Sequence, residues 1–180
     1  SISDTYRIAV IGDNSVIKSL NLDAGLHRET QTSMLDVQPR LQFIRYENDS
    51  VLNSDDQFLN INYSYELVKS YISLGLDYSR ENTMTSEFET TGLIQTNRRR
   101  AKYDLTPSYY YEINPETTAF VNISGSDVSY QNSSNTALVD YSYTSYSLGL
   151  IRELSSINKI TFTVYTSKLD AATVESMTTN

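Results

Sequence analysis

Two runs of alternating apolar and polar residues follow each other, in opposite phase, between residues 56 and 80. In the first run, residues 59–67, the odd positions are apolar and the even positions are polar; in the second, residues 72–79, this phase is inverted. A period of two is the pattern of a β-strand with one apolar and one polar face. Each run has about ten residues, the length that a tilted strand needs to cross a bilayer. The pair therefore predicts a transmembrane β-hairpin.

The same alternation recurs along the chain and predicts further strands. Apolar residues take alternate positions in the ranges 6–10, 20–26, 35–43, 101–113, 119–123, 146–150 and 160–164. Gly125 stands at a change of phase, after which Val128 and Tyr130 take over the apolar row. A strand glycine at such a position predicts a β-bulge. Pro39 and Pro107 lie inside predicted strands, where each removes a ladder hydrogen bond, a costly loss in lipid unless a bulge frees the position.

The connections between the predicted strands alternate in length. Short links at 28–33, 68–70, 114–117 and 155–158 alternate with long ones at 47–57, 81–97, 131–140 and from 169 onward. Outer-membrane barrels have short periplasmic turns and long external loops, whereas a soluble β-sandwich has no reason to sort its loops. The ordering predicts an all-β fold, an antiparallel up-and-down transmembrane β-barrel with its amino terminus on the periplasmic side. The link 81–97 has apolar residues of its own and is expected to fold over the barrel mouth.

The number of strands bears on how such a barrel closes. The pattern contains about nine strands, whereas bacterial single-chain barrels have even strand counts. The 180 residues are therefore expected to form one domain, 1–180, that is a segment of a larger barrel or shares a barrel with other chains.

Composition supports a membrane-facing sheet and argues against other classes. The chain has 15 tyrosines and 5 phenylalanines but no tryptophan and no cysteine. Tyrosine can face lipid with its ring and the headgroups with its hydroxyl. A secreted, soluble β-rich protein with a structural or adhesive role also favours tyrosine and threonine, and it is the alternative. The net charge of −8 argues against a nucleic-acid partner, and no apolar run reaches the roughly 18 residues of a transmembrane helix.

Several short segments carry a resemblance to a known group of proteins. They are Asn97-Arg98-Arg99-Arg100, Leu105-Thr106-Pro107-Ser108-Tyr109, Asp127-Val128-Ser129-Tyr130, Val139-Asp140-Tyr141 and Ser147-Leu148-Gly149-Leu150. Over about residues 20–170 the chain resembles Gram-negative outer-membrane β-barrels associated with exopolysaccharide export. The resemblance implies a passive channel or export component of the Gram-negative outer membrane, for solutes or polysaccharide. Outer-membrane lipid and other envelope proteins would then be its partners.

Charged residues of the polar rows would face the lumen of the predicted barrel. The lumen-lining candidates are Arg40, Glu66, Asp77, Arg100, Lys102, Asp104 and Glu112. Rings of charge in a lumen tune ion preference, although opposite charges that pair to fill a narrow interior would give the same pattern. Arg98 and Arg99 stand where the longest loop re-enters the barrel, and arginine matches phosphate bidentately. These two are lipopolysaccharide-contact candidates, with a solvated loop stem as the alternative.

Other chemistry has little support in the sequence. His27 is the one histidine and has no cysteine beside it, so we expect no zinc site. The acidic residues Glu47, Asp49, Asp55 and Asp56 could bind calcium, but their spacing differs from that of an EF-hand and favours a solvated loop. No serine stands in a Gly-x-Ser-x-Gly motif. We therefore expect no cofactor and no enzymatic activity; a membrane-barrel enzyme would need His27 beside a serine.

Overall fold

One antiparallel β-sheet contains every strand of the computed structural model, which describes residues 2–11, 15–47, 50, 53–83, 98–131 and 139–171. The strands are β1 (Ile2–Ile11), β2 (Ser15–Ala24), β3 (Leu26–Glu29), β4 (Ser33–Tyr46), β5 (Ser54–Glu66), β6 (Ser70–Asn82), β7 (Arg99–Asn114), β8 (Thr117–Tyr130), β9 (Tyr141–Glu153) and β10 (Lys159–Ala171). Among the described residues, no helix is long and apolar enough to cross a membrane.

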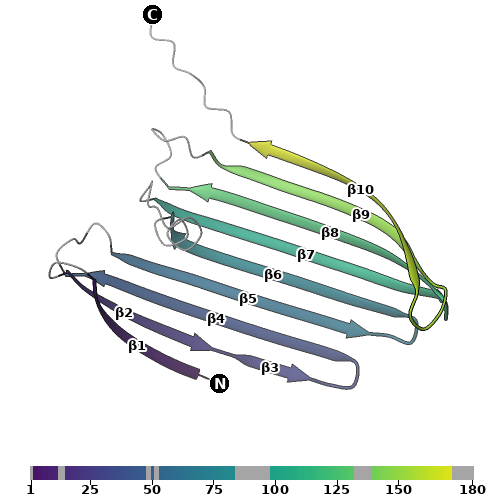
Figure 1. The fold of residues 1–180 in the computed structure, drawn as a ribbon, viewed down its shortest axis with the longest axis horizontal. Helices are drawn as coiled ribbons and strands as arrows, with labels where there is room; N and C mark the ends of the chain where they lie inside the picture. The colour runs from purple at the N-terminus through teal and green to yellow at the C-terminus, as the bar shows by residue number, and fades with distance from the viewer. Residues whose placement is uncertain are drawn as a thin grey trace, which may run out of the picture.

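The strands follow one another across the sheet in chain order (Figure 1). Because β2 and β3 both pair with β4, they occupy one strand position, and the sheet has nine positions that run up and down. The outer strands β1 and β10 each pair with one neighbour in the described part of the chain, so the sheet is open. The structure confirms the all-β, antiparallel, up-and-down fold with nine strand positions. The sheet is not closed among the described residues, so the finer prediction of a transmembrane barrel is not confirmed.

The two ends of the sheet carry different connections. Residues 30–32, 67–69, 115–116 and 154–158 join strands at one end, called here the short-turn end (Figure 1). At the opposite, long-link end the chain passes from β4 to β5, from β6 to β7 and from β8 to β9 through longer segments. The link from β1 to β2, also at this end, is short. Of the segment expected to fold over a barrel mouth, residues 84–97 lie outside the described residues.

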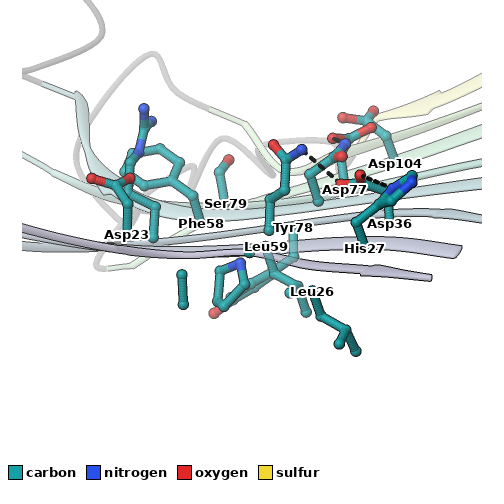
Figure 2. Close-up of a pocket in the computed structure, with 16 residues that line it drawn as sticks. Asp23, Leu26, His27, Asp36, Phe58, Leu59, Asp77, Tyr78, Ser79 and Asp104 are labelled. Atoms are coloured by element: carbon teal, nitrogen blue, oxygen red, sulfur yellow. Dashed lines mark hydrogen bonds and ion pairs between the residues drawn. The ribbon is translucent and has the colours of Figure 1, made fainter. Parts of the chain in front are cut away.

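The register gives the sheet two unlike faces. Alternate residues of a strand project to opposite faces, and Ile61 pairs with Val37 on one side and Leu76 on the other. Leu76 in turn pairs with Leu105. The face that these residues share is called the apolar face, and the opposite one the polar face. Figure 2 shows Leu26 on one side of the sheet and the carboxylates Asp36 and Asp77 on the other.

The apolar face has no layer packed on it in the part of the chain that the structure describes. Leu74 on β6 is 37% exposed, and Leu148 on β9 is 61% exposed. Within the described residues the buried apolar side chains are Phe120 and Val128, at 7% and 1% exposure, and the register places both on the polar face. Soluble monomers rarely expose a contiguous apolar patch larger than a few hundred Å². The apolar face is therefore a contact surface that the described chain itself does not cover.

Pro39 and Pro107 each interrupt the backbone pairing between two strands but leave the register of that pairing unchanged. Pairing along β4 stops at Asp23 of β2 and resumes at Leu26 of β3, opposite Pro39, in an unchanged register. Pairing between β7 and β8 lapses beside Pro107 and also resumes in the same register. A proline has no N–H to donate, so the ladder loses a bond on that side. Pro39 thus explains why β2 and β3 are separate strands.

The β-bulge predicted at Gly125 is wrong. β8 keeps a constant register with β7 and with β9 on either side of Gly125, and the shift in the β7–β8 pair lies between Glu112 and Asn114. Val128 and Tyr130 consequently lie on the polar face rather than in the apolar row. The apparent change of phase reflects an apolar side chain buried on the polar face and not an extra residue in the strand.

Phe120 packs over Gly149 on the polar face. These residues are cross-strand partners of β8 and β9, and the Phe120 ring centroid lies 5.7 Å from that of Tyr110. A Cβ at position 149 would overlap both the Phe120 ring and the Phe162 carbonyl oxygen. The absence of a side chain at 149 therefore makes room for the aromatic ring.

Gly149→Ala should lower the free energy of unfolding by about 1–3 kcal/mol, because overpacking forces the ring and the backbone apart. The measurement is the shift of the urea-unfolding midpoint. Gly125→Ala is the matched control, since no heavy atom lies within 4 Å of a Cβ added there, and it should not destabilise the protein. Equal losses for the two variants would contradict this packing.

Candidate functional site

The polar face carries all seven residues predicted to line a lumen. They are Arg40 on β4, Glu66 on β5, Asp77 on β6, and Arg100, Lys102, Asp104 and Glu112 on β7. The structure does not gather all of them in one place. Glu66 and Glu112 lie at the short-turn end, whereas Arg100 lies near the long-link end. Asp77, Asp104 and Lys102 meet in the middle of the sheet.

A hollow of about 850 Å³ lies against this central region. Residues from β2 to β7 line it, and those with a formal charge are Asp23, Asp36, Asp77, Asp104 and Arg40. Figure 2 shows the labelled aspartates and His27 on the same side of the sheet. The curvature of the sheet and its polar rows therefore concentrate carboxylates in one open hollow.

Two aspartates stand directly opposite each other in this region. Asp77 on β6 and Asp104 on β7 are cross-strand partners on the polar face, an arrangement that destabilises a sheet when both are ionised. Lys102 Nζ lies 2.8 Å from Asp104 Oδ2. Asn60 donates from Nδ2 to Asp77 Oδ1 at 2.5 Å, and Asn62 donates to Asn60 Oδ1 at 2.6 Å. Lys102 thus compensates the charge of Asp104. Among these contacts, Asp77 is held only by a chain of neutral amides, Asn60 and then Asn62.

A second carboxylate group lies on β4 beside the hollow. Asp36 Oδ2 lies 3.1 Å from His27 Nδ1, and Gln38 donates from Nε2 to Asp36 Oδ1 at 2.6 Å. The second ring nitrogen of His27 lies 3.7 Å from Glu29. His27 is therefore held by carboxylates and has no serine as a hydrogen-bond partner among these contacts. Asp23 and Asp36 were missed by sequence reasoning, although both fall in the polar rows.

Two further cations of the polar face, Arg100 and Arg40, have contacts of their own. Arg100 pairs with Glu81, and both side chains are largely shielded from solvent. The guanidinium of Arg40 lies 4.1 Å from the centroid of the Phe58 ring, a cation–π contact. Neither of these two contacts involves Asp77. Opposite charges do pair on this face, Arg100 with Glu81 and Lys102 with Asp104. The carboxylates that line the hollow nevertheless outnumber the cations beside it.

The acidic residues considered for calcium do not form a site in the described part of the chain. Asp55 pairs with Arg45 at 2.5 Å, and Asp56, which is 1% exposed, accepts hydrogen bonds from Ser54 and from the backbone of Asn82. Asp49 lies outside the described residues. Within those residues no group of three or more potential metal ligands comes together.

The two arginines predicted to contact lipopolysaccharide are separated by the start of β7. Arg98 precedes the strand, and its backbone N–H donates to Thr83 Oγ1 at 3.0 Å. Arg99 is the first residue of β7, and its guanidinium donates to the Asp55 carbonyl oxygen at 3.1 Å. By alternation Arg99 belongs to the apolar face, at the long-link end. Lys18, Arg45 and Arg80 lie in rows of the same face at the same end.

Neither protein-family models, nor curated proteins, nor solved structures match the chain. The resemblance to barrels of exopolysaccharide export therefore stays a prediction. The site is defined by its own geometry: an apolar face that the described residues leave uncovered, an opposite polar face, and a central hollow with more carboxylates than cations.

Proposed function

We propose that the chain forms a wall, or a segment of the wall, of an outer-membrane β-barrel that acts as a passive channel or export component. The observation that carries this proposal is the uncovered apolar face. Its leucine, isoleucine and tyrosine side chains are aligned across eight strand positions, from β2 to β10, and the described residues put no protein layer over them. In a bilayer the acyl chains would cover this face, and the polar face would line an interior, as in barrels of this class.

The dimensions of the strands support this assignment. β6 has 13 residues, which at about 3.4 Å per residue span about 44 Å. A tilt of about 40° reduces that to about 34 Å along the membrane normal, close to the hydrocarbon thickness of about 30 Å.

Tyrosines flank the apolar rows at two levels, as the aromatic girdles of such barrels do. Tyr78 and Tyr103 are cross-strand partners on the long-link side of the middle of β6 and β7, with ring centroids 4.8 Å apart. Tyr109 and Tyr111 lie on the same face towards the short-turn end. From Tyr103 to Tyr111 the chain extends about 27 Å along the strand. At a tilt of about 40° this is about 21 Å along the membrane normal, slightly less than the apolar band of about 25 Å between two girdles.

Closure as a fully antiparallel barrel would require strands beyond the nine described positions. The open edges of β1 and β10 would leave backbone groups unpaired in lipid, at several kcal/mol each. Since nine is odd, β1 and β10 run in the same direction, so a fully antiparallel barrel needs an odd number of additional strands. An even total then results, as in bacterial single-chain barrels.

The proposal distinguishes a membrane protein from a secreted soluble β-rich protein. We expect the full chain to float with lipid vesicles after folding into them, and to migrate differently on a detergent gel before and after heating. Solubility in plain buffer, with no flotation and no change in migration, would support the secreted protein and end the barrel proposal.

Leu74→Arg tests the facing of the sheet, because arginine on a lipid-facing strand costs about 2–4 kcal/mol near the bilayer midplane. The variant should fold into vesicles with a lower yield and a lower urea midpoint. Ser73→Arg places the same side chain on the adjacent residue, which faces the opposite side, and should insert as the native chain does. Equal effects of the two arginines would refute the assignment of the faces.

The cations at the long-link end of the apolar face suit anionic headgroups, and we assign them to phosphate groups of lipopolysaccharide. Arg80 and Arg99 lie beyond the level of Tyr78 and Tyr103, where headgroups would begin. Arg99 is held by a neutral carbonyl oxygen, so its charge is not cancelled by that contact. Arginine presents a planar fork that matches phosphate.

The double variant Arg80→Ala, Arg99→Ala should retain less lipopolysaccharide when the protein is purified in detergent, with a loss of about tenfold if one phosphate contact of about 1.4 kcal/mol is removed. Arg152→Ala removes a cation from the opposite end, where Arg152 pairs with Glu116. It should retain lipopolysaccharide like the native chain. Equal retention by all three proteins would contradict a contact at this end.

A further inference from the structure

The centre of the polar face holds an excess of negative charge that pairing on this face does not remove. Four aspartates border the central hollow: Asp23, Asp36, Asp77 and Asp104. Arg40 borders it too, and Lys102 reaches Asp104 from beside it. Four carboxylates thus face two cations, and His27 is counted as neutral at pH 7. The excess lies where the sheet is hollowed and not at a solvated rim.

The opposed aspartates are a feature that packing does not require. Asp77 and Asp104 are direct cross-strand partners, which disfavours folding when both are charged. The neighbouring polar-face positions 60 and 62 are asparagines, which show that a neutral amide of similar shape suits this surface. Where a sequence breaks a local rule of stability without a structural gain, a functional role is the expected reason.

Several cations near the long-link end do not offset the central carboxylates. Arg80 and Arg99 lie on the apolar face at its long-link end. On the polar face, Arg100 is occupied by Glu81 near that same end, so that it does not offset the central carboxylates. The interior side of the sheet is therefore negative at its centre.

On these grounds, and resting on the proposed barrel, we infer that the polar face makes the channel selective for small cations over anions, with Asp77 and Asp104 as the main specificity-determining residues. Rings of acidic side chains favour cations in pores. The carboxylates are dispersed over several strands, and no cluster of metal ligands forms among the described residues. The group would act through its summed field on ions in transit rather than by coordinating one ion.

The test is the reversal potential of the full-length protein in planar bilayers under a KCl gradient. We expect the native channel to pass potassium in preference to chloride. Asp77→Asn and Asp104→Asn should each lower the local potassium concentration by about twofold, the effect of one unit charge at about 8 Å in water. The double variant should lower the preference further. In about 1 M KCl, where the Debye length is about 3 Å, these differences should shrink.

Asp127→Asn is the matched control, because it removes one carboxylate from the opposite face of the sheet. It should leave the reversal potential unchanged. A channel that is anion-selective or unselective, or equal effects of the three substitutions, would overturn the cation inference and leave the barrel intact. A protein that floats with vesicles but carries no current would also overturn this inference alone. Failure to insert at all would overturn the barrel proposal as well.

Discussion

The structure depends on the cross-strand register, which aligns the apolar rows of successive strands on one face. Ile61, Leu76 and Leu105 are consecutive partners across β5, β6 and β7, and a slip of one residue in any pair would turn a whole row to the other face. Hairpins with short turns restrict such slips because each turn sets the pairing of the strands it joins. The register therefore produces both the continuous apolar face and the carboxylate-rich polar face.

Much of this architecture follows from the sequence because a period of two is a local property. The hairpin of β5 and β6, the sorting of most links and the polar row of β7 are all visible in the order of residues. Where a residue has an exceptional environment the local pattern misleads. Val128 is apolar but buried on the polar face, so the alternation alone predicted a bulge that does not exist. The closure of the sheet cannot be predicted from periodicity, because it concerns strands that are not neighbours in the chain.

The candidate site was predictable in part for a related reason. Asp77 and Asp104 were each identified from their rows, yet only the register makes them partners. Asp36 was overlooked because its role depends on β3 bringing His27 beside it. Pro39, which separates β2 from β3, also lines the hollow that these side chains share. Pairwise geometry of this kind arises between strands and has no counterpart in the spacing of residues along one strand.

The most direct test of the account is the accessibility of alternate residues on β6 in lipid. The chain has no cysteine, so single cysteines at Ile72, Leu74 and Leu76, and at Ser73, Asp77 and Ser79, can be labelled without background. In vesicles we predict that a water-soluble maleimide reacts with the second set and that lipid shields the first. Reaction of both sets to the same extent, or shielding of the first set in the absence of lipid, would contradict an apolar face that meets the bilayer.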